Sequence, residues 1–219
     1  IDRPITLRGA GDLTRLVGFG RGSVVRVDVG PEEEVRLEGL SLEAGDADEG
    51  GALLVRRGRV MASHLRMSRS RARVGGAVAA TGGVLVLERV RIEHAEAERG
   101  GAVWVGSGAS VELLEAQISG SRARYGGALA VEAGGRLWLE SVTVRRSRAL
   151  ERNGGQVLFV AGGGVPAEVA LDRVRFADPP LGRPLVLEGS GAVAVSGCDL
   201  PRSTAAEPGV LDRGDNRWR

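Results

Sequence analysis

The stretch RARVGGAVAA, at positions 71–80, returns as RARYGGALAV at positions 122–131. Its central glycine pair recurs through the chain, followed by alanine in all but the last copy, at Gly50-Gly51, Gly75-Gly76, Gly100-Gly101, Gly126-Gly127 and Gly154-Gly155. Successive copies are 25, 25, 26 and 28 residues apart. A period of this size is typical of proteins built from stacked repeats. The Gly-Gly-Ala phrase therefore marks the start of a repeating unit.

A second set of positions keeps the same period. Each unit ends in an alternating segment such as LVLERVRI (85–92), and the last apolar residues of these segments are Leu42, Met67, Ile92, Ile118, Val144, Phe176 and Leu200. Alternating apolar and polar residues indicate strands. Three short strands in about 25 residues make one coil of a parallel β-helix, in which each coil is buried by its neighbours. Leucine-rich repeats have a similar period, but their leucine ladder and buried Asn are missing here.

We therefore predict an all-β fold, a single-stranded right-handed parallel β-helix of about eight or nine coils. It forms one domain over residues 1–219, because a chain of this length suits one substantial core. Residues 1–34 would form the N-terminal coil and cap, 35–176 the regular coils, and 177–219 the C-terminal coils and cap.

Composition excludes several kinds of site. All 30 basic residues are arginine, which rules out a lysine Schiff base and a P-loop lysine. Cys198 is the single cysteine and His64 and His94 are the only histidines, so neither an internal disulfide nor a Cys/His zinc cluster can form. The longest weakly polar run, 74–87, is interrupted by glycine pairs, and we expect no membrane insertion by this segment. We predict no cofactor and no metal.

The residues before each glycine pair alternate in charge from one repeat to the next. We name the two resulting rows the charge ladder: Asp46, Arg71, Glu96 and Arg122, and then Asp48, Arg73, Glu98 and Arg124. With coils about 4.8 Å apart, each arginine would lie between carboxylates of its neighbours and help to fix the register. Only Arg66 and Arg69 of the basic stretch 66–73 would stay free, and the net charge is +2, so we predict no nucleic-acid partner.

Two candidates for an interaction surface follow from the same alignment. The alternation of charge ends in the fifth repeat, which leaves a basic excess at Arg145, Arg146, Arg148 and Arg152. The strand after each glycine pair has an outward face of small or apolar residues, in the rows Ala52, Ala77, Ala102, Ala128, Gln156 and Leu54, Ala79, Trp104, Ala130, Leu158. Without a carboxylate, this face does not suit a catalytic acid pair. Trp104 would centre a contact surface, unless the face is covered by a neighbouring domain or simply left as small side chains.

One row of acids could line a turn of the solenoid, because its members lie four residues before the repeat anchors: Glu38, Glu88, Glu140 and Asp172. A calcium site or an acid/base role is one interpretation of this row. The intervening repeats place Ser63, Leu114 and Ser196 there, which favours a solvated turn.

The repeat resembles that of polymorphic outer-membrane proteins and related pectin-lyase-like β-helix proteins, which carry GGA[ILV] and FxxN motifs. The first motif stands at positions 75–78 and 126–129, whereas the FxxN half is degraded, with Met67 to Ser70 and Ile118 to Ser121 in its place. The resemblance covers nearly the whole chain and implies a β-helix. It implies little about function, because this architecture serves adhesins as well as polysaccharide lyases and hydrolases.

We expect a non-enzymatic bacterial scaffold or adhesin-like module, placed extracellularly or at the outer-membrane surface, that binds a protein or a glycan. One alternative is a carbohydrate-active β-helix, a lyase or hydrolase whose site is not recognised. Another is an intracellular interaction module whose partners are neighbouring domains of a larger chain.

Overall fold

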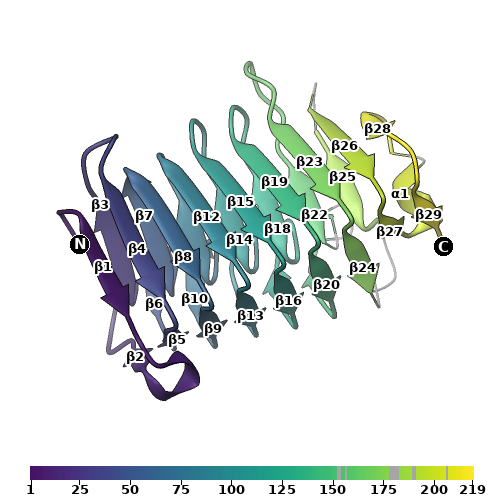
Figure 1. Cartoon of the computed structure of the whole chain (residues 1–219). Helices are drawn as coiled ribbons and strands as arrows, with labels where there is room; N and C mark the ends of the chain where they lie inside the picture. Colours follow the sequence, from purple (N-terminus) through teal and green to yellow (C-terminus); the bar gives the residue numbers. More distant parts are fainter. Residues whose placement is uncertain (152–153, 156, 178–182, 189–190, 206) are drawn as a thin grey trace.

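The computed structural model describes residues 1–151, 154–155, 157–177, 183–188, 191–205 and 207–219. It is an all-β structure in which parallel strands stack as a solenoid of about seven turns, roughly 26 residues apart (Figure 1). The chain advances along one axis, so the two termini lie at opposite ends of the stack (Figure 1). The predicted β-helix is thereby confirmed.

Three sheets run the length of the solenoid within the described ranges. Sheet 1 is the order β1 (Ile5–Arg8), β4 (Glu34–Glu38), β8 (Arg59–Ser63), β12 (Val84–Glu88), β15 (Ser110–Leu114), β19 (Arg136–Glu140), β23 (Glu168–Asp172), β26 (Ala192–Ser196) and β28 (Val210–Asp212). Sheet 2 is β2 (Arg15–Val17), β5 (Ser41–Glu43), β9 (Arg66–Ser68), β13 (Arg91–Glu93), β16 (Gln117–Ser119), β20 (Thr143–Arg145), β24 (Arg175–Ala177), β27 (Asp199–Leu200) and β29 (Arg217–Trp218). Sheet 3 is β3 (Val25–Asp28), β7 (Leu53–Arg57), β11 (Val78–Ala80), β14 (Val103–Val105), β18 (Leu129–Val131), β22 (Leu158–Val160) and β25 (Leu185–Leu187).

Shorter elements complete the coils. Two strand pairs precede the glycine corners, β6 (Asp46–Glu49) with β10 (Arg71–Val74) and β17 (Arg122–Ala123) with β21 (Arg148–Ala149). The described helical segments are the 3-10 turn η1 (Gly11–Leu13) and the single-turn helix α1 (Arg202–Ala205).

The predicted count of eight or nine coils was slightly too high. Sheet 3 contains seven strands among the described residues, while sheets 1 and 2 contain nine each. Each turn from β1–β3 to β23–β25 contributes a strand to all three sheets, whereas the C-terminal strands β26 to β29 extend only sheets 1 and 2 among the described residues.

The core is a set of internal stacks that run through the coils. The seven predicted repeat anchors point inward from sheet 2 and are each at most 1% exposed. Consecutive anchors are in register, as Met67 with Ile92 and Ile92 with Ile118. Each inward side chain thus buries its neighbours above and below, which is how an aliphatic chain with few aromatics obtains a continuous core.

Sharp turns at left-handed backbone positions join the sheets. Between sheets 1 and 2 these positions form one row with φ from 50 to 60°: Gly39, His64, Arg89, Glu115, Ser141, Arg173 and Gly197. After sheet 2 they form another row with φ from 52 to 66°: Ala44, Arg69, His94, Gly120 and Arg146. His64 and His94 thus lie in different rows.

The glycine corners explain the Gly-Gly-Ala phrase. Gly126 has φ of 63°, and a Cβ atom there would overlap the carbonyl oxygen of Leu129, because the corner folds back onto the strand that it starts. Gly50, Gly75 and Gly100 repeat this geometry. A side chain on Gly101 would instead meet the Gly127 carbonyl oxygen of the next coil. The first glycine permits the turn, and the second permits close stacking.

The fifth corner is displaced by one residue from its predicted position. Gly155, with φ of 66°, faces the carbonyl oxygen of Leu158 and is therefore the counterpart of Gly126. In register, Leu129 pairs with Leu158 and Ala130 with Phe159. The predicted row that placed Leu158 with Ala130 was wrong because this coil carries its extra residues before the corner. Gln156, predicted beside Ala128, lies outside the described residues.

Candidate interaction surfaces

Trp104 is not a free contact residue. It points outward from β14 but is only partly exposed, and its Nε1 donates a hydrogen bond to Glu132 Oε1 at 2.9 Å. Arg99 Nη1 lies 2.9 Å from the same Glu132 oxygen. The indole N–H is therefore already hydrogen-bonded within the protein.

The outward face of sheet 3 is largely covered by the chain. Ala79 and Ala130 are 0% and 1% exposed, since the corner glycines pack against this side of the strands. Farther along, Ala130, Phe159 and Val186 form a second buried cluster, against which Tyr125 packs with its ring centroid 5.3 Å from that of Phe159. This cover comes from the preceding turn segments, so it needs no neighbouring domain.

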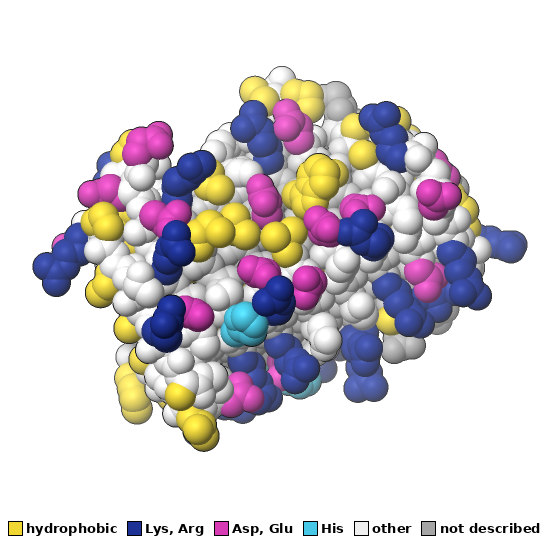
Figure 2. Space-filling model, viewed as in Figure 1, with side chains coloured by type: hydrophobic (Ala, Val, Ile, Leu, Met, Phe, Trp, Pro, Cys, Tyr) yellow, Lys and Arg dark blue, Asp and Glu magenta, His cyan; other side chains and the backbone are white. Residues whose placement is uncertain are grey.

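Trp138 is the exposed tryptophan that the sequence reasoning missed. It stands at the middle of β19 on the outward face of sheet 1 and is 48% exposed. Its row along the sheet contains Met61, Val86, Glu112 and Ala170. Figure 2 shows hydrophobic side chains gathered in a band on this side of the molecule, with charged side chains on both sides of it. The signal was present in the sequence, because Trp138 occupies a polar position of the alternating segment 137–144.

A shallow hollow of about 260 Å³ lies beside Trp138. Glu112, in register with Trp138 on the neighbouring strand, lines the hollow and forms no ion pair among the described residues. Arg136 and Glu168 line the same hollow and form an ion pair with Nε and Oε2 3.1 Å apart. An indole face flanked by polar groups suits a ligand that has both apolar and hydrogen-bonding surfaces.

The row of turn acids does lie along one edge, as Glu38, Ser63, Glu88, Leu114, Glu140, Asp172 and Ser196 in successive register. Each acid of this row forms an ion pair with an arginine. Arg8 Nε lies 2.8 Å from Glu38, Arg89 contacts Glu88, and Arg173 contacts both Glu140 and Asp172. Among the described residues, no three side chains of His, Cys, Asp or Glu come together as a metal site.

The first row of the charge ladder lies in consecutive register, with Asp46 beside Arg71, Arg71 beside Glu96, and Glu96 beside Arg122. Arg71 and Glu96 form an ion pair at 3.1 Å, the only one within the two rows that the described residues show. From the second row, Arg124 instead pairs with Glu151 at 3.0 Å. All four residues of the first row are thus in register, but only one pair of them is in direct contact, as expected for exposed side chains.

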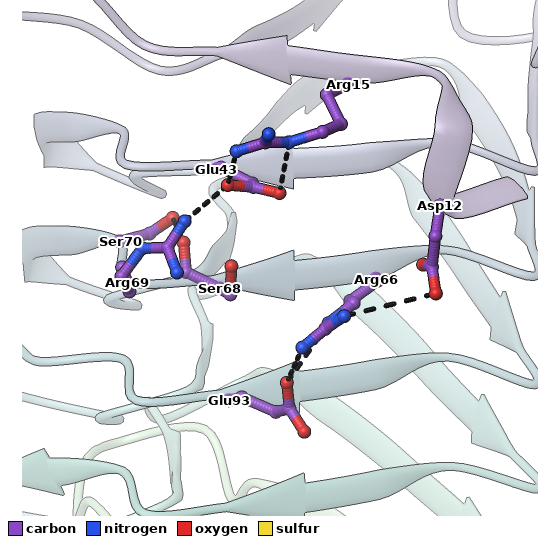
Figure 3. A network of polar contacts seen from close by, with 8 residues as sticks. All are labelled: Asp12, Arg15, Glu43, Arg66, Ser68, Arg69, Ser70 and Glu93. Atoms are coloured by element: carbon purple, nitrogen blue, oxygen red, sulfur yellow. Dashed lines mark hydrogen bonds and ion pairs between the residues drawn. The ribbon is translucent and has the colours of Figure 1, made fainter.

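Figure 3 shows that Arg66 and Arg69, which were predicted to be free, both form ion pairs with glutamates. Arg69 contacts Glu43, which also accepts hydrogen bonds from Arg15 Nε at 2.9 Å and Nη2 at 2.7 Å. Arg66 Nη2 lies 2.9 Å from Glu93 Oε2, and its Nη1 lies 3.9 Å from Asp12. The hydrogen bond from Arg15 lowers the pKa of the Glu43 carboxyl, and the bond to Glu93 raises the pKa of Arg66.

The predicted cluster of arginines in the fifth repeat is split between faces. Arg145 points outward from β20, and Arg146 follows it at a left-handed turn. Arg148 lies in β21 beside Arg122, on a different side of the coil. Arg152 lies outside the described residues. Arg145 and Arg146 instead share a pocket with Arg91, Glu93 and His94, which the sequence alignment did not bring together.

No family model, curated protein or solved structure matches the chain. Within the described part of the chain, no helix is long and apolar enough to cross a membrane.

Proposed function

We propose that this protein is a non-enzymatic binding scaffold, in which the outer faces of the β-helix present side chains to a protein or glycan partner. The exposure of Trp138 within an apolar band carries the proposal. Tryptophan is enriched among the residues that dominate binding energy, and exposed apolar patches with polar surroundings commonly mark interaction sites.

The arrangement of the acids supports binding rather than catalysis. Glu38, Glu88, Glu140 and Asp172 line one edge, where a row of carboxylates could have served as acids and bases, but each contacts an arginine. A general acid or base must instead reach a proton on the substrate.

The resemblance of the glycine repeat to polymorphic outer-membrane proteins supports a place for the module at a bacterial surface, extracellular or on the outer membrane. A stack of coils suits such display, because every coil adds outward positions without changing the core. Neighbouring domains of a larger chain are further partners in this proposal.

A ligand screen on a glycan array and against candidate surface proteins, with affinities then measured by calorimetry, tests the proposal. Trp138→Ala should weaken binding of a ligand found in this way by about tenfold or more. Phe19→Ala is the matched control, because Phe19 is 95% exposed but lies away from sheet 1. Equal affinity in the two variants, or cleavage of a glycan by the protein, would overturn the proposal.

A further inference from the structure

A pocket of about 290 Å³ opens on the outward face of sheet 2, across β13, β16 and β20. Its polar lining includes Arg91, His94, Gln117, Ser119, Arg145 and Arg146. This volume is at the lower end of the sizes typical of small-molecule sites.

The three arginines of this pocket differ from those around them. Arg91, Arg145 and Arg146 form no ion pair or side-chain hydrogen bond among the described residues. In contrast, Arg66 on the preceding coil and Arg89 on the same coil as Arg91 both form ion pairs with glutamates. The one carboxylate of the lining, Glu93, accepts hydrogen bonds from Arg66 Nε and Nη2. The pocket therefore holds an excess of positive charge that the protein itself does not neutralise.

Gly120 leaves room for the pocket. It occupies the left-handed turn position between those of His94 and Arg146, and it lines the hollow without a side chain. A Cβ atom on Gly120 would lie 2.8 Å from His94 Nδ1, so any larger residue would displace the imidazole. The hollow thus lies between two side chains that carry hydrogen-bond donors.

We propose that this pocket binds a tetrahedral oxyanion, a sulfate or phosphate group such as a sugar monoester carries. Guanidinium groups match such oxyanions in geometry as well as charge, because they donate two parallel hydrogen bonds. The Ser119 hydroxyl and the Gln117 amide add neutral donors, and the negative charge of a sulfate or phosphate group complements the surplus of arginines. This inference goes beyond the proposed function, since it names a ligand class for a second face of the β-helix, on sheet 2 rather than sheet 1.

The test is a titration of the whole chain, followed by amide chemical shifts, with inorganic sulfate, inorganic phosphate, glucose 6-sulfate, glucose 6-phosphate and, as the neutral control, glucose. Shifts should be largest at residues 91–94, 117–120 and 145–146. The double variant Arg145→Gln/Arg146→Gln should weaken binding by about tenfold or more. Arg59→Gln is the matched control, because Arg59 is exposed on sheet 1 and has no ion pair among the described residues.

If the esters bind more tightly than the inorganic anions, the site exists and its ligand is a sugar ester. If they bind equally tightly, the site exists and its ligand is the free anion. Equal weakening by Arg59→Gln, or absence of saturable binding by any anion, would overturn the inference. Thermal unfolding of each variant checks that its fold is intact. The Trp138→Ala result is independent of this site, so failure here would leave the proposed function standing, and the reverse also holds.

Discussion

At the corner glycines, a left-handed backbone coincides with a position where no side chain fits. Gly126 and Gly108 separate these two effects, because both have positive φ, 63° and 78°, but only Gly126 faces a backbone oxygen within contact distance. We expect Gly126→Ala to destabilise the fold by about 3 kcal/mol or more, and Gly108→Ala by about 1 kcal/mol, in urea unfolding. Equal losses would show that the close approach at the corner costs nothing beyond backbone strain.

Glu43 should make stability depend on pH. Hydrogen bonding to Arg15 lowers its pKa in the folded state, so its contribution is complete above the unfolded value of about 4.3 and is lost as the pH falls through the folded pKa. We expect the wild-type free energy of unfolding to fall more steeply below about pH 5 than that of Glu43→Gln, which is already less stable at pH 7.

Urea unfolding at a series of pH values measures this difference. Glu32→Gln is the control, since Glu32 is exposed and has no ion pair among the described residues. If wild type and Glu43→Gln became less stable in parallel, the contacts of Glu43 with Arg15 and Arg69 would not contribute.

Between neighbouring strands, the charge ladder should act on register through repulsion as well as attraction. Glu96→Arg would place four arginines in consecutive register, at positions 71, 96, 122 and 148. We expect a loss of about 1 kcal/mol at low salt that becomes smaller in 1 M NaCl, because exposed charges are screened. Glu96→Gln, which removes the ion pair with Arg71 without adding a charge, should lose less. Identical, salt-independent losses in thermal unfolding would contradict a role for like-charge repulsion.

The strands and their order could be predicted from the sequence because each coil repeats the same local pattern. The predicted register failed only in the fifth coil, where Gly155 rather than Gly154 starts the strand. A glycine pair does not reveal which member carries the positive φ. Which glycine has the positive φ depends on the backbone carbonyl group that it packs against, and this contact forms only in the folded chain.

The candidate surfaces were harder to predict than the fold. Alternation correctly separates inward from outward positions, but it does not show which outward residues stay exposed. Trp104 and Trp138 both point outward, yet the first is bound to Glu132 and the second is open to solvent. Likewise, Arg66 and Arg69 were expected to be free, and carboxylates from neighbouring coils occupy them. Such contacts join residues about 25 positions apart, so they follow from the coil register.

In the whole molecule, stability should decrease toward the two ends of the stack. Each inner strand of sheet 1 is paired on both sides, whereas β1 and β28 are paired on one side, and Ile5 and Leu211 are 42% and 45% exposed. In a solenoid, each repeat contacts only its neighbours, so an end coil can open without the rest.

Cys198 reports on this opening at the C-terminal end. It is 1% exposed, its Sγ accepts a hydrogen bond from the Val174 amide, and burial raises the pKa of its thiol. Because the thiolate is the reactive form, the folded protein should resist alkylation until the terminal coil opens.

Trp218 packs against the core in the C-terminal coil, and Leu7 does so at the opposite end. We expect Trp218→Ala to accelerate alkylation of Cys198 by about tenfold or more, and Leu7→Ala to change it by less than about twofold. Mass spectrometry of samples quenched over time measures both rates. Equal acceleration in the two variants would mean that the coils open together as one cooperative unit, in which a substitution at either end destabilises the whole stack.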